Sequence, residues 1–154
     1  MDLLIDIGNS RVKWATLKDG QLGPQQALAR HGWSKADWLQ LLQSSGARVD
    51  RVFVATVAGE RDAQPLQEAV EEGGAAFEFV ESQAEAAGVR NAYSEPAQLG
   101  VDRWLAVGAA SRLVDGPCCI VDIGTAATID ALGPDKRHLG GYIGPGPDLM
   151  GQSL

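Results

Sequence analysis

Two stretches of the sequence share an apolar run that ends in Asp-Ile-Gly followed by small polar residues. The first is Asp6-Ile7-Gly8-Asn9-Ser10 and the second is Asp122-Ile123-Gly124-Thr125. Glycine lets the backbone turn tightly, and exposed N–H groups beside amide or hydroxyl donors form a concavity suited to phosphate oxygens. A carboxylate at the end of the preceding strand can hold a hydrated metal ion against those phosphates. The repeat therefore predicts two phosphate-binding turns.

An ordinary hairpin turn is the alternative for each stretch, because Asp-x-Gly is common in such turns. Neither stretch is a Walker-type phosphate-binding loop. Such a loop needs Gly-Lys-Ser/Thr followed by a helix, whereas here that motif is absent and a strand is expected after the turn. Taken singly, each stretch favours the ordinary turn. Taken together, at the heads of two domains, the two stretches favour phosphate binding.

A third stretch, Leu99–Trp104, places an acid beside a base at an expected helix start. The helix dipole favours Asp102 in a first turn, which explains the acid but not the neighbouring Arg103. A carboxylate here could accept a proton from a substrate hydroxyl, and the guanidinium could hold an anion in bidentate fashion. Spacing alone leaves open whether Asp102 is catalytic or only suited to a helix start.

The elements that must position these residues follow from hydrophobic periodicity and turn signals. Residues 2–17 indicate a β-hairpin, and residues 118–132 indicate a second hairpin of the same design. A capping box at Ser34 and Asp37, with Trp33 and Trp38 as a hydrophobic staple, begins a helix. The rest of the pattern predicts, in order, an end to that helix near Gly46, a strand at Val52–Val57, a helix over 61–72, a strand at Phe77–Val80, a helix over 99–114, a short strand within 140–146 and a helix start after Asp148.

This alternation of strands and helices predicts an α/β fold in which helices flank a mixed sheet. The turn signal Asp115-Gly116-Pro117 suggests a domain boundary, with a first domain over residues 1–115 and a second over 116–154. The second domain would contain only its opening strands, which are too few to bury a core. We therefore expect an incomplete second domain and a chain that is the front part of a longer protein.

The bulk composition excludes several classes of partner. With 13 basic and 20 acidic residues the net charge is −7, which disfavours binding to nucleic acid. No apolar stretch is long enough to span a bilayer. The acidic residues Asp2 and Asp6 interrupt the first apolar run, whereas the apolar region of a signal peptide has no acidic residues. Adjacent Cys118 and Cys119 are expected to be small apolar fillers in a reduced, cytoplasmic environment. We expect a cytoplasmic protein without a membrane or nucleic-acid partner.

The motifs, in this order, resemble those of type III pantothenate kinase. The family is similar to the actin-like ATPase and sugar-kinase superfamily, in which two ribonuclease-H-like domains face each other and ATP lies between their first hairpins. The resemblance thus implies ribonuclease-H-like domains, the second of them incomplete. It rests on Asp6-Ile-Gly8-Asn9-Ser10-Arg11-x-Lys13-Trp14, on Tyr93 with Pro96, on Leu99-Gly-Val-Asp102-Arg103-Trp104, on Asp122-x-Gly124-Thr125-Ala126-x-Thr128-x-Asp130, and on Gly140-Gly141-x-Ile143-x-Pro145-Gly146.

The resemblance also implies a role for each matching residue. Asp102 would be the base that takes the proton from the pantothenate hydroxyl. Asp122 would bind a monovalent cation, K⁺ or NH₄⁺, and Asp6 would lie near the magnesium of MgATP. The ATP phosphates would be bound by Asp6, Ile7, Gly8, Asn9, Ser10, Arg11, Val12, Lys13 and Thr125. The pantothenate site would comprise Tyr93, Gly100, Val101, Asp102 and Arg103.

The implied reaction converts ATP and pantothenate into ADP and 4′-phosphopantothenate, the first step of coenzyme A synthesis, in a homodimer. Ser10 stands where the family often has Thr, which keeps the hydroxyl. Two alternatives are a regulatory protein like the Bvg accessory factors, without kinase activity, and another small-molecule kinase or polyphosphate-hydrolysing enzyme of the superfamily. The intact site residues favour an enzyme over a regulator, and Gly100–Arg103 with Tyr93 favours pantothenate over another substrate.

Overall fold

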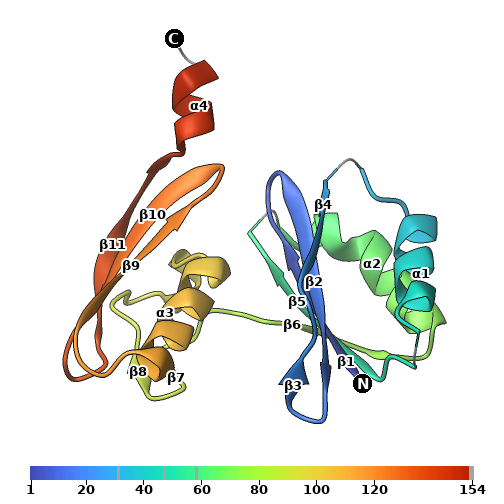
Figure 1. The fold of residues 1–154 in the computed structure, drawn as a ribbon, viewed down its shortest axis with the longest axis horizontal. Coiled ribbons are helices and arrows are strands. Elements are labelled where there is room, and N and C mark those ends of the chain that lie inside the picture. The colour runs from blue at the N-terminus through green and yellow to red at the C-terminus, as the bar shows by residue number, and fades with distance from the viewer. Residues whose placement is uncertain (31, 47, 58, 153–154) are drawn as a thin grey trace. The chain divides into compact units, whose positions relative to one another are not determined.

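A computed structural model describes residues 1–30, 32–46, 48–57 and 59–152. The chain forms two compact units, Met1–Val80 and Glu81–Leu154, whose elements are labelled in Figure 1. Each unit has its own sheet, and each is considered by itself below.

A mixed sheet forms the frame of the first unit. The strands lie in the order β3-β2-β1-β5-β6, with β4 paired to β2. The β1–β2 hairpin is antiparallel, whereas β1 pairs β5 and β5 pairs β6 in parallel. The predicted hairpin over residues 2–17 and the predicted mixed sheet are therefore confirmed. The strands are β1 (Asp2–Ile7), β2 (Arg11–Lys18), β3 (Gln21–Leu22), β4 (Gln26–Ala29), β5 (Arg51–Thr56) and β6 (Ala76–Phe79).

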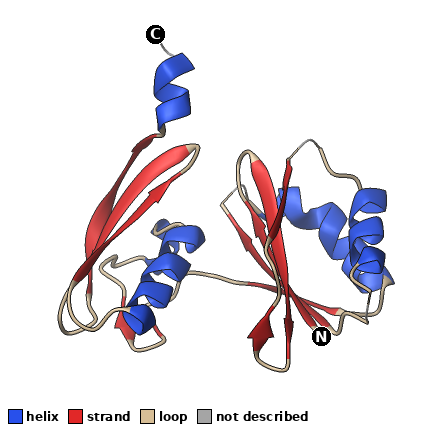
Figure 2. Ribbon diagram, viewed as in Figure 1, coloured by secondary structure: helices blue, strands red, loops and turns tan. Residues whose placement is uncertain are grey.

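Two helices, α1 (Lys35–Ser44) and α2 (Glu60–Glu72), cover one face of this sheet (Figure 2). Leu3, Ile5 and Ile7 alternate along β1 with more exposed residues, so one side of the strand lies in the core beneath the helices. The core also buries Leu66 of α2 and Trp38 of α1.

The start of α1 follows the sequence prediction closely. Ser34 is the N-cap: its hydroxyl accepts from the Asp37 N–H, and the Asp37 carboxylate accepts from the Ser34 N–H at 2.8 Å. The rings of Trp33 and Trp38 pack with centroids 4.4 Å apart. The capping box and the packing expected of a hydrophobic staple are confirmed, and the helix ends just before Gly46, whose φ is +72°.

A three-stranded antiparallel sheet, in the order β11-β10-β9, forms the frame of the second unit. Helix α3 packs against β9 and β10, and Val89, Leu99, Trp104, Val107 and Leu132 share one core. The elements are β7 (Glu85–Ala86), β8 (Val89–Arg90), the short 3₁₀ helix η1 (Pro96–Gln98), α3 (Val101–Leu113), β9 (Cys118–Ile123), β10 (Ala126–Leu132), β11 (His138–Pro145) and α4 (Pro147–Gln152).

The boundary between the compact units lies at Val80/Glu81, and the domain boundary near residue 115 stays a prediction. The physical reason is the packing of α3: its Trp104 and Val107 are buried with Leu132 of β10, so the helix belongs to the same unit as the second hairpin. The turn signal at 115–117 is a real turn, but it separates a helix from the strand on which that helix packs. The sequence pattern marked a loop and could not tell which core the helix joins.

The second hairpin, β9–β10, is confirmed, but its turn differs from the first. Three residues, Gly8–Ser10, separate β1 from β2, whereas only Gly124 and Thr125 separate β9 from β10. Strand β11 is longer than predicted, and the short pair β7–β8 was not predicted because each strand has only two residues.

Removal of the Ser34 hydroxyl tests the capping box. Because the Asp37 N–H would lose its acceptor, Ser34→Ala is expected to lower the free energy of unfolding by about 1 kcal/mol. Ser34→Thr keeps an oxygen and should stay within about 0.5 kcal/mol of the wild type. Urea denaturation of the chain measures both, and equal stability of Ser34→Ala and the wild type would contradict the assignment.

Candidate functional site

The first turn presents backbone and small polar side chains to solvent. Asn9 and Ser10 are exposed and Gly8 is half-buried. The Gly8 N–H donates to the Arg11 carbonyl at 3.0 Å, and a Cβ on Gly8 would come within 3.2 Å of that oxygen. The glycine therefore permits a tight turn that holds the exposed residues at its tip.

The strands on either side of this turn separate buried from exposed residues. Ile7 and Val12 are both in the core, so only their backbone is available to a ligand. Asp6 and Lys13 are paired in register, and the Lys13 Nζ lies 3.2 Å from the Asp6 Oδ2. Because side chains alternate along a strand, this pair lies on the sheet face opposite the helices, and both side chains are partly exposed. Arg11, next to the turn, is exposed.

Arg30, which was not among the predicted site residues, stabilises the first turn by hydrogen bonds to its backbone carbonyls. Its backbone N–H donates to the Ser10 carbonyl at 2.9 Å, and its Nη1 donates to the Gly8 carbonyl at 3.2 Å. Its Nη2 forms an ion pair with Asp62 in the first turn of α2. The Arg30 side chain thus connects the first turn to α2. No motif in the sequence around Arg30 predicts this role.

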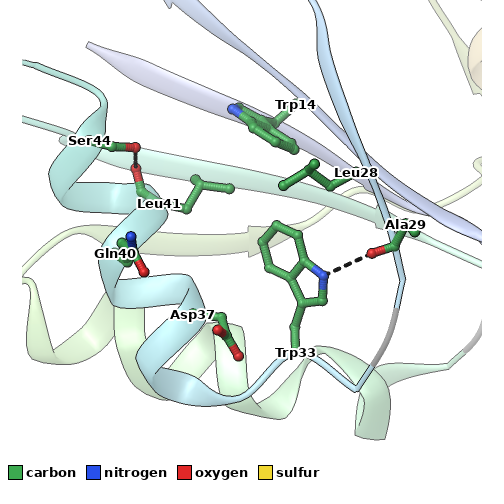
Figure 3. Close-up of a pocket in the computed structure, with 8 residues that line it drawn as sticks. All are labelled: Trp14, Leu28, Ala29, Trp33, Asp37, Gln40, Leu41 and Ser44. Carbon is green, nitrogen blue, oxygen red and sulfur yellow. Dashed lines mark hydrogen bonds between the residues drawn. The ribbon is translucent and has the colours of Figure 1, made fainter.

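The described residues of the first unit line cavities on either side of Trp33. One of about 460 Å³ lies beside the first turn and is lined by Asn9, Arg30 and Arg61, among others. The other, of about 550 Å³, is largely apolar and is lined by Trp14, Leu28 and Trp33, whose indole N–H donates to the Ala29 carbonyl (Figure 3). No residue of the predicted sites lines the second cavity.

The second turn has a close backbone neighbour. Asp122 and Thr125 are exposed at this turn. The chain returns after β11, where the Gly146 N–H donates to the Thr125 carbonyl at 2.9 Å. A Cβ on Gly146 would overlap the Gly124 carbonyl oxygen, so only glycine permits this approach. Pro145-Gly146 therefore supports the turn from its far side.

The predicted substrate residues gather at the start of α3. Gly100 is the N-cap, Val101 is buried, and Asp102 in the first turn is exposed. The Asp102 Oδ1 accepts from the Arg103 N–H at 2.7 Å, which fixes the carboxylate near the helix end where the dipole favours a negative charge.

Arg103 points into the unit instead of into solvent. Its Nε lies 2.8 Å from the Asp130 Oδ2 and its Nη2 lies 2.7 Å from the Asp130 Oδ1, and both residues are buried. His138, fully buried, places its Nε2 2.8 Å from the same Oδ1. The ring of Tyr93 stacks on that of His138, with centroids 6.1 Å apart.

Hydrogen bonds favour the charged forms of Arg103 and Asp130. The hydrogen bond to Asp130 raises the pKa of the Arg103 guanidinium, and Tyr93 acts in the same direction. Burial alone would raise the pKa of Asp130, but its hydrogen bonds with Arg103 and His138 outweigh burial and hold that pKa below the usual value. Because an ionised carboxylate can only accept, the His138 Nε2 carries the proton that it donates.

The structure thus brings Tyr93 and Gly100–Arg103 together in one unit, with Asp122 and Thr125 on the hairpin of that unit. The first-turn residues gather in the other unit. Asp130 and Gly141 were quoted in the motifs without a role, and His138 carried no sequence signal. Among the described residues, no cluster of three or more His, Cys, Asp or Glu side chains is placed to bind a metal. No helix of the described chain is long and apolar enough to cross a membrane.

Comparison with known proteins identifies close sequence relatives. A family model described as type III pantothenate kinase matches residues 2–154. The type III pantothenate kinase of Azoarcus sp. strain BH72 is 40% identical over 154 residues, which cover 100% of this chain and 58% of the relative. That of Nitrosococcus oceani is 40% identical over 160 residues, covering 100% of this chain and 60% of the relative. The chain therefore spans about three fifths of the length of these relatives.

A solved structure shares the fold at low sequence identity. The Ppx/GppA phosphatase of Aquifex aeolicus, in its type II variant, matches 99% of this chain and 54% of its own, with a TM-score of 0.54 and 16% identity. At this identity the likeness concerns the fold alone. It supports the predicted α/β fold in which helices flank a mixed sheet.

Substitution of Gly146 tests the support of the second turn. Because the added methyl group would overlap the Gly124 carbonyl, Gly146→Ala is expected to lower the free energy of unfolding by about 1–3 kcal/mol. Gly151→Ala in α4, where an added Cβ meets no atom within 4 Å, is the matched control. Chemical denaturation measures both, and equal effects of the two substitutions would contradict the close approach.

Removal of the Arg30 side chain tests the fastening of the first turn. Loss of its bond to the Gly8 carbonyl should weaken the turn locally by about 1 kcal/mol, so that the Gly8 amide exchanges about 5-fold faster in Arg30→Ala. Arg61→Ala, an exposed neighbour at the same cavity, should leave that exchange rate unchanged. Hydrogen exchange by NMR decides, and unchanged exchange in Arg30→Ala would refute the role of Arg30.

Proposed function

Because the chain belongs to the type III pantothenate kinase family, we propose that the protein transfers the γ-phosphoryl group of ATP to the hydroxyl group of pantothenate. The products would be 4′-phosphopantothenate and ADP, in the first step of coenzyme A synthesis. The observation that carries this proposal is the family match over residues 2–154, with the matching motif residues at exposed turns and at one helix start. The relatives are longer than this chain, so the proposal concerns the protein at its natural length.

The two turns would bind the phosphates of ATP. Phosphoryl transfer needs mainly alignment and neutralisation of developing charge. The first turn would offer the backbone of Gly8–Ser10, with Lys13 and Arg11 on the adjoining strand, while Thr125 would serve from the second turn. The exposure of both turns supports this role, and the fastening of the first by Arg30 keeps its backbone in place.

Two carboxylates would hold cations. Asp6 lies at the end of β1, partly exposed and 3.2 Å from the Lys13 Nζ, where it would stand near the Mg²⁺ of MgATP. Asp122, exposed on β9 beside the second turn, would bind a monovalent cation such as K⁺ or NH₄⁺. Carboxylate and backbone oxygens are ligands that hard cations prefer, so the donors at both positions fit such ions. A bound cation would neutralise charge that develops on the transferred phosphoryl group.

The start of α3 would bind pantothenate. Asp102 would accept the proton of the attacking hydroxyl, a role supported by its exposure and by the fixed position of its carboxylate. Tyr93, Gly100, Val101 and Arg103 would complete the site, and their presence in one compact unit supports this grouping.

We also propose that the protein is a cytoplasmic homodimer without a nucleic-acid partner. The acidic net charge of −7 supports the last point, and family resemblance supports the others. The regulatory alternative gains no support from the matched relatives, which are kinases by name.

Release of ADP tests the proposed function. The protein at its natural length, supplied with MgATP and KCl, should release ADP when pantothenate is added and far less without it. Replacement of KCl by NaCl tests the monovalent cation separately. Absence of pantothenate-dependent ADP release would reject the proposed function.

Substitution of the proposed base tests its role. Asp102→Asn keeps the shape of the side chain but cannot accept the proton, so turnover should fall by about 10²–10⁴-fold while ATP binding stays nearly intact. Asp115→Asn, which changes an exposed carboxylate just after α3, is the matched control and should keep full turnover. Steady-state kinetics and ATP titration measure both quantities, and undiminished turnover in Asp102→Asn would exclude it as the base.

A further inference from the structure

The proposed function leaves Asp130, His138 and Gly141 without a role, although they lie around the ion pair of Arg103 and Asp130. Asp130 lies on β10 and the other two lie on β11, so three separate elements meet at one guanidinium. A buried ion pair contributes little net stability compared with well-packed apolar residues. Stability alone therefore does not account for this cluster.

The geometry divides the Arg103 guanidinium into two edges. Arginine has five N–H donors in a rigid plane. Asp130 takes the Nε and one Nη2 donor, at 2.8 and 2.7 Å. Both Nη1 donors and the second Nη2 donor point away from this carboxylate, and Tyr93 shares a hydrogen bond with the same guanidinium. Arg103 can thus hold Asp130 with one edge while it offers the other to a ligand.

His138 forms a second contact with the carboxylate of Asp130. Its Nε2 lies 2.8 Å from the Asp130 Oδ1, the oxygen that also accepts from the Arg103 Nη2. Full burial of His138 and its stacking on Tyr93 restrict the imidazole ring. Tyr93, itself a predicted substrate residue, is thereby joined to the same cluster.

Gly141 leaves the space that the cluster needs. A Cβ at this position would overlap the Asp130 Oδ1 and lie 2.5 Å from the Arg103 Nη2. Gly141 is paired in register with Asp130 on the neighbouring strand. This overlap explains why glycine occupies position 141 of the Gly140-Gly141 motif, because a side chain on Gly141 would displace the ion pair of Arg103 and Asp130.

We propose that Asp130, supported by His138, is a positioning residue that locks Arg103 so that its Nη1 edge meets an oxygen of pantothenate. An arginine side chain is flexible, and a locked guanidinium loses less freedom when the substrate binds. The proposal rests on the proposed function and assigns Asp130 and His138 no contact with the substrate.

Kinetics of Asp130→Asn, in the protein at its natural length, test the proposal. The amide keeps the shape of the side chain but turns one acceptor into a donor that faces Arg103. The KM for pantothenate should rise by about 10–100-fold, as expected when a charge-assisted hydrogen bond is misplaced. The KM for ATP and kcat should stay within about 3-fold of the wild type, since neither depends on Arg103 in this account. An unchanged KM for pantothenate, or an equal loss in all three parameters, would overturn the proposal.

Asp135→Asn is the matched control. Asp135 lies between β10 and β11, is exposed, and pairs with Arg90 at 3.0 Å. An exposed ion pair of this kind contributes little. The same chemical change should therefore leave all kinetic parameters unchanged.

A double-mutant cycle separates positioning from a purely structural role. If Asp130 acts through Arg103, then Arg103→Gln and the double variant Arg103→Gln/Asp130→Asn should have the same raised KM for pantothenate. Additive effects would show that Asp130 acts independently of Arg103 and would contradict the proposal. The double variant should also be more stable than either single variant, because it leaves no buried charge unpaired.

The His138 position provides a milder pair of variants should Asp130→Asn fail to fold. Gln can still donate from its amide nitrogen to Asp130, whereas Leu cannot, so His138→Gln should raise the KM for pantothenate less than His138→Leu. Equal KM values in two folded variants would overturn the role of His138. If the wild type releases no pantothenate-dependent ADP, the proposed function fails by itself; calorimetric titration of pantothenate into the same variants then decides whether Asp130 positions Arg103 for binding.

Discussion

The buried pair of Arg103 and Asp130 connects the main elements of the second unit. The pair joins the first turn of α3 to β10, and His138 extends it to β11. The buried side chains of Trp104 and Val107 hold the same side of α3 against the sheet. With Arg103 turned inward, Asp102 at the preceding position faces solvent. The ion pair thus holds the side chain of Arg103, while the carboxylate of Asp102 is held separately by the backbone N–H of residue 103.

Different contacts stabilise the two turns. Each turn exposes residues at its tip. The first is held by Arg30, whose side chain reaches a carbonyl of the turn and a carboxylate of α2. The second is held by the backbone of Gly146, which approaches so closely that no side chain fits. The repeat in the sequence therefore does not extend to the residues that stabilise each turn.

Local patterns predicted local structure well in this chain. The capping box at Ser34, the hairpins and the helix over α3 all depend on neighbours in sequence, and they are confirmed. Long-range partners could not be predicted in this way. Asp130 lies 27 positions from Arg103 and Arg30 lies 32 positions from Asp62, and neither pairing has a periodic signal. The boundary between the compact units at Val80/Glu81 also depends on a long-range contact, since it is set by the sheet that α3 covers.

The central claim is that the start of α3 binds pantothenate with Asp102 at the reacting hydroxyl. A crystal structure of the protein at its natural length, with pantothenate and a non-hydrolysable ATP analogue, tests it most directly. The account predicts the pantothenate hydroxyl within hydrogen-bond distance of the Asp102 carboxylate, and a pantothenate oxygen on the Nη1 edge of an Arg103 that still holds Asp130. Pantothenate bound away from α3, or an Arg103 that leaves Asp130 to reach it, would contradict the account.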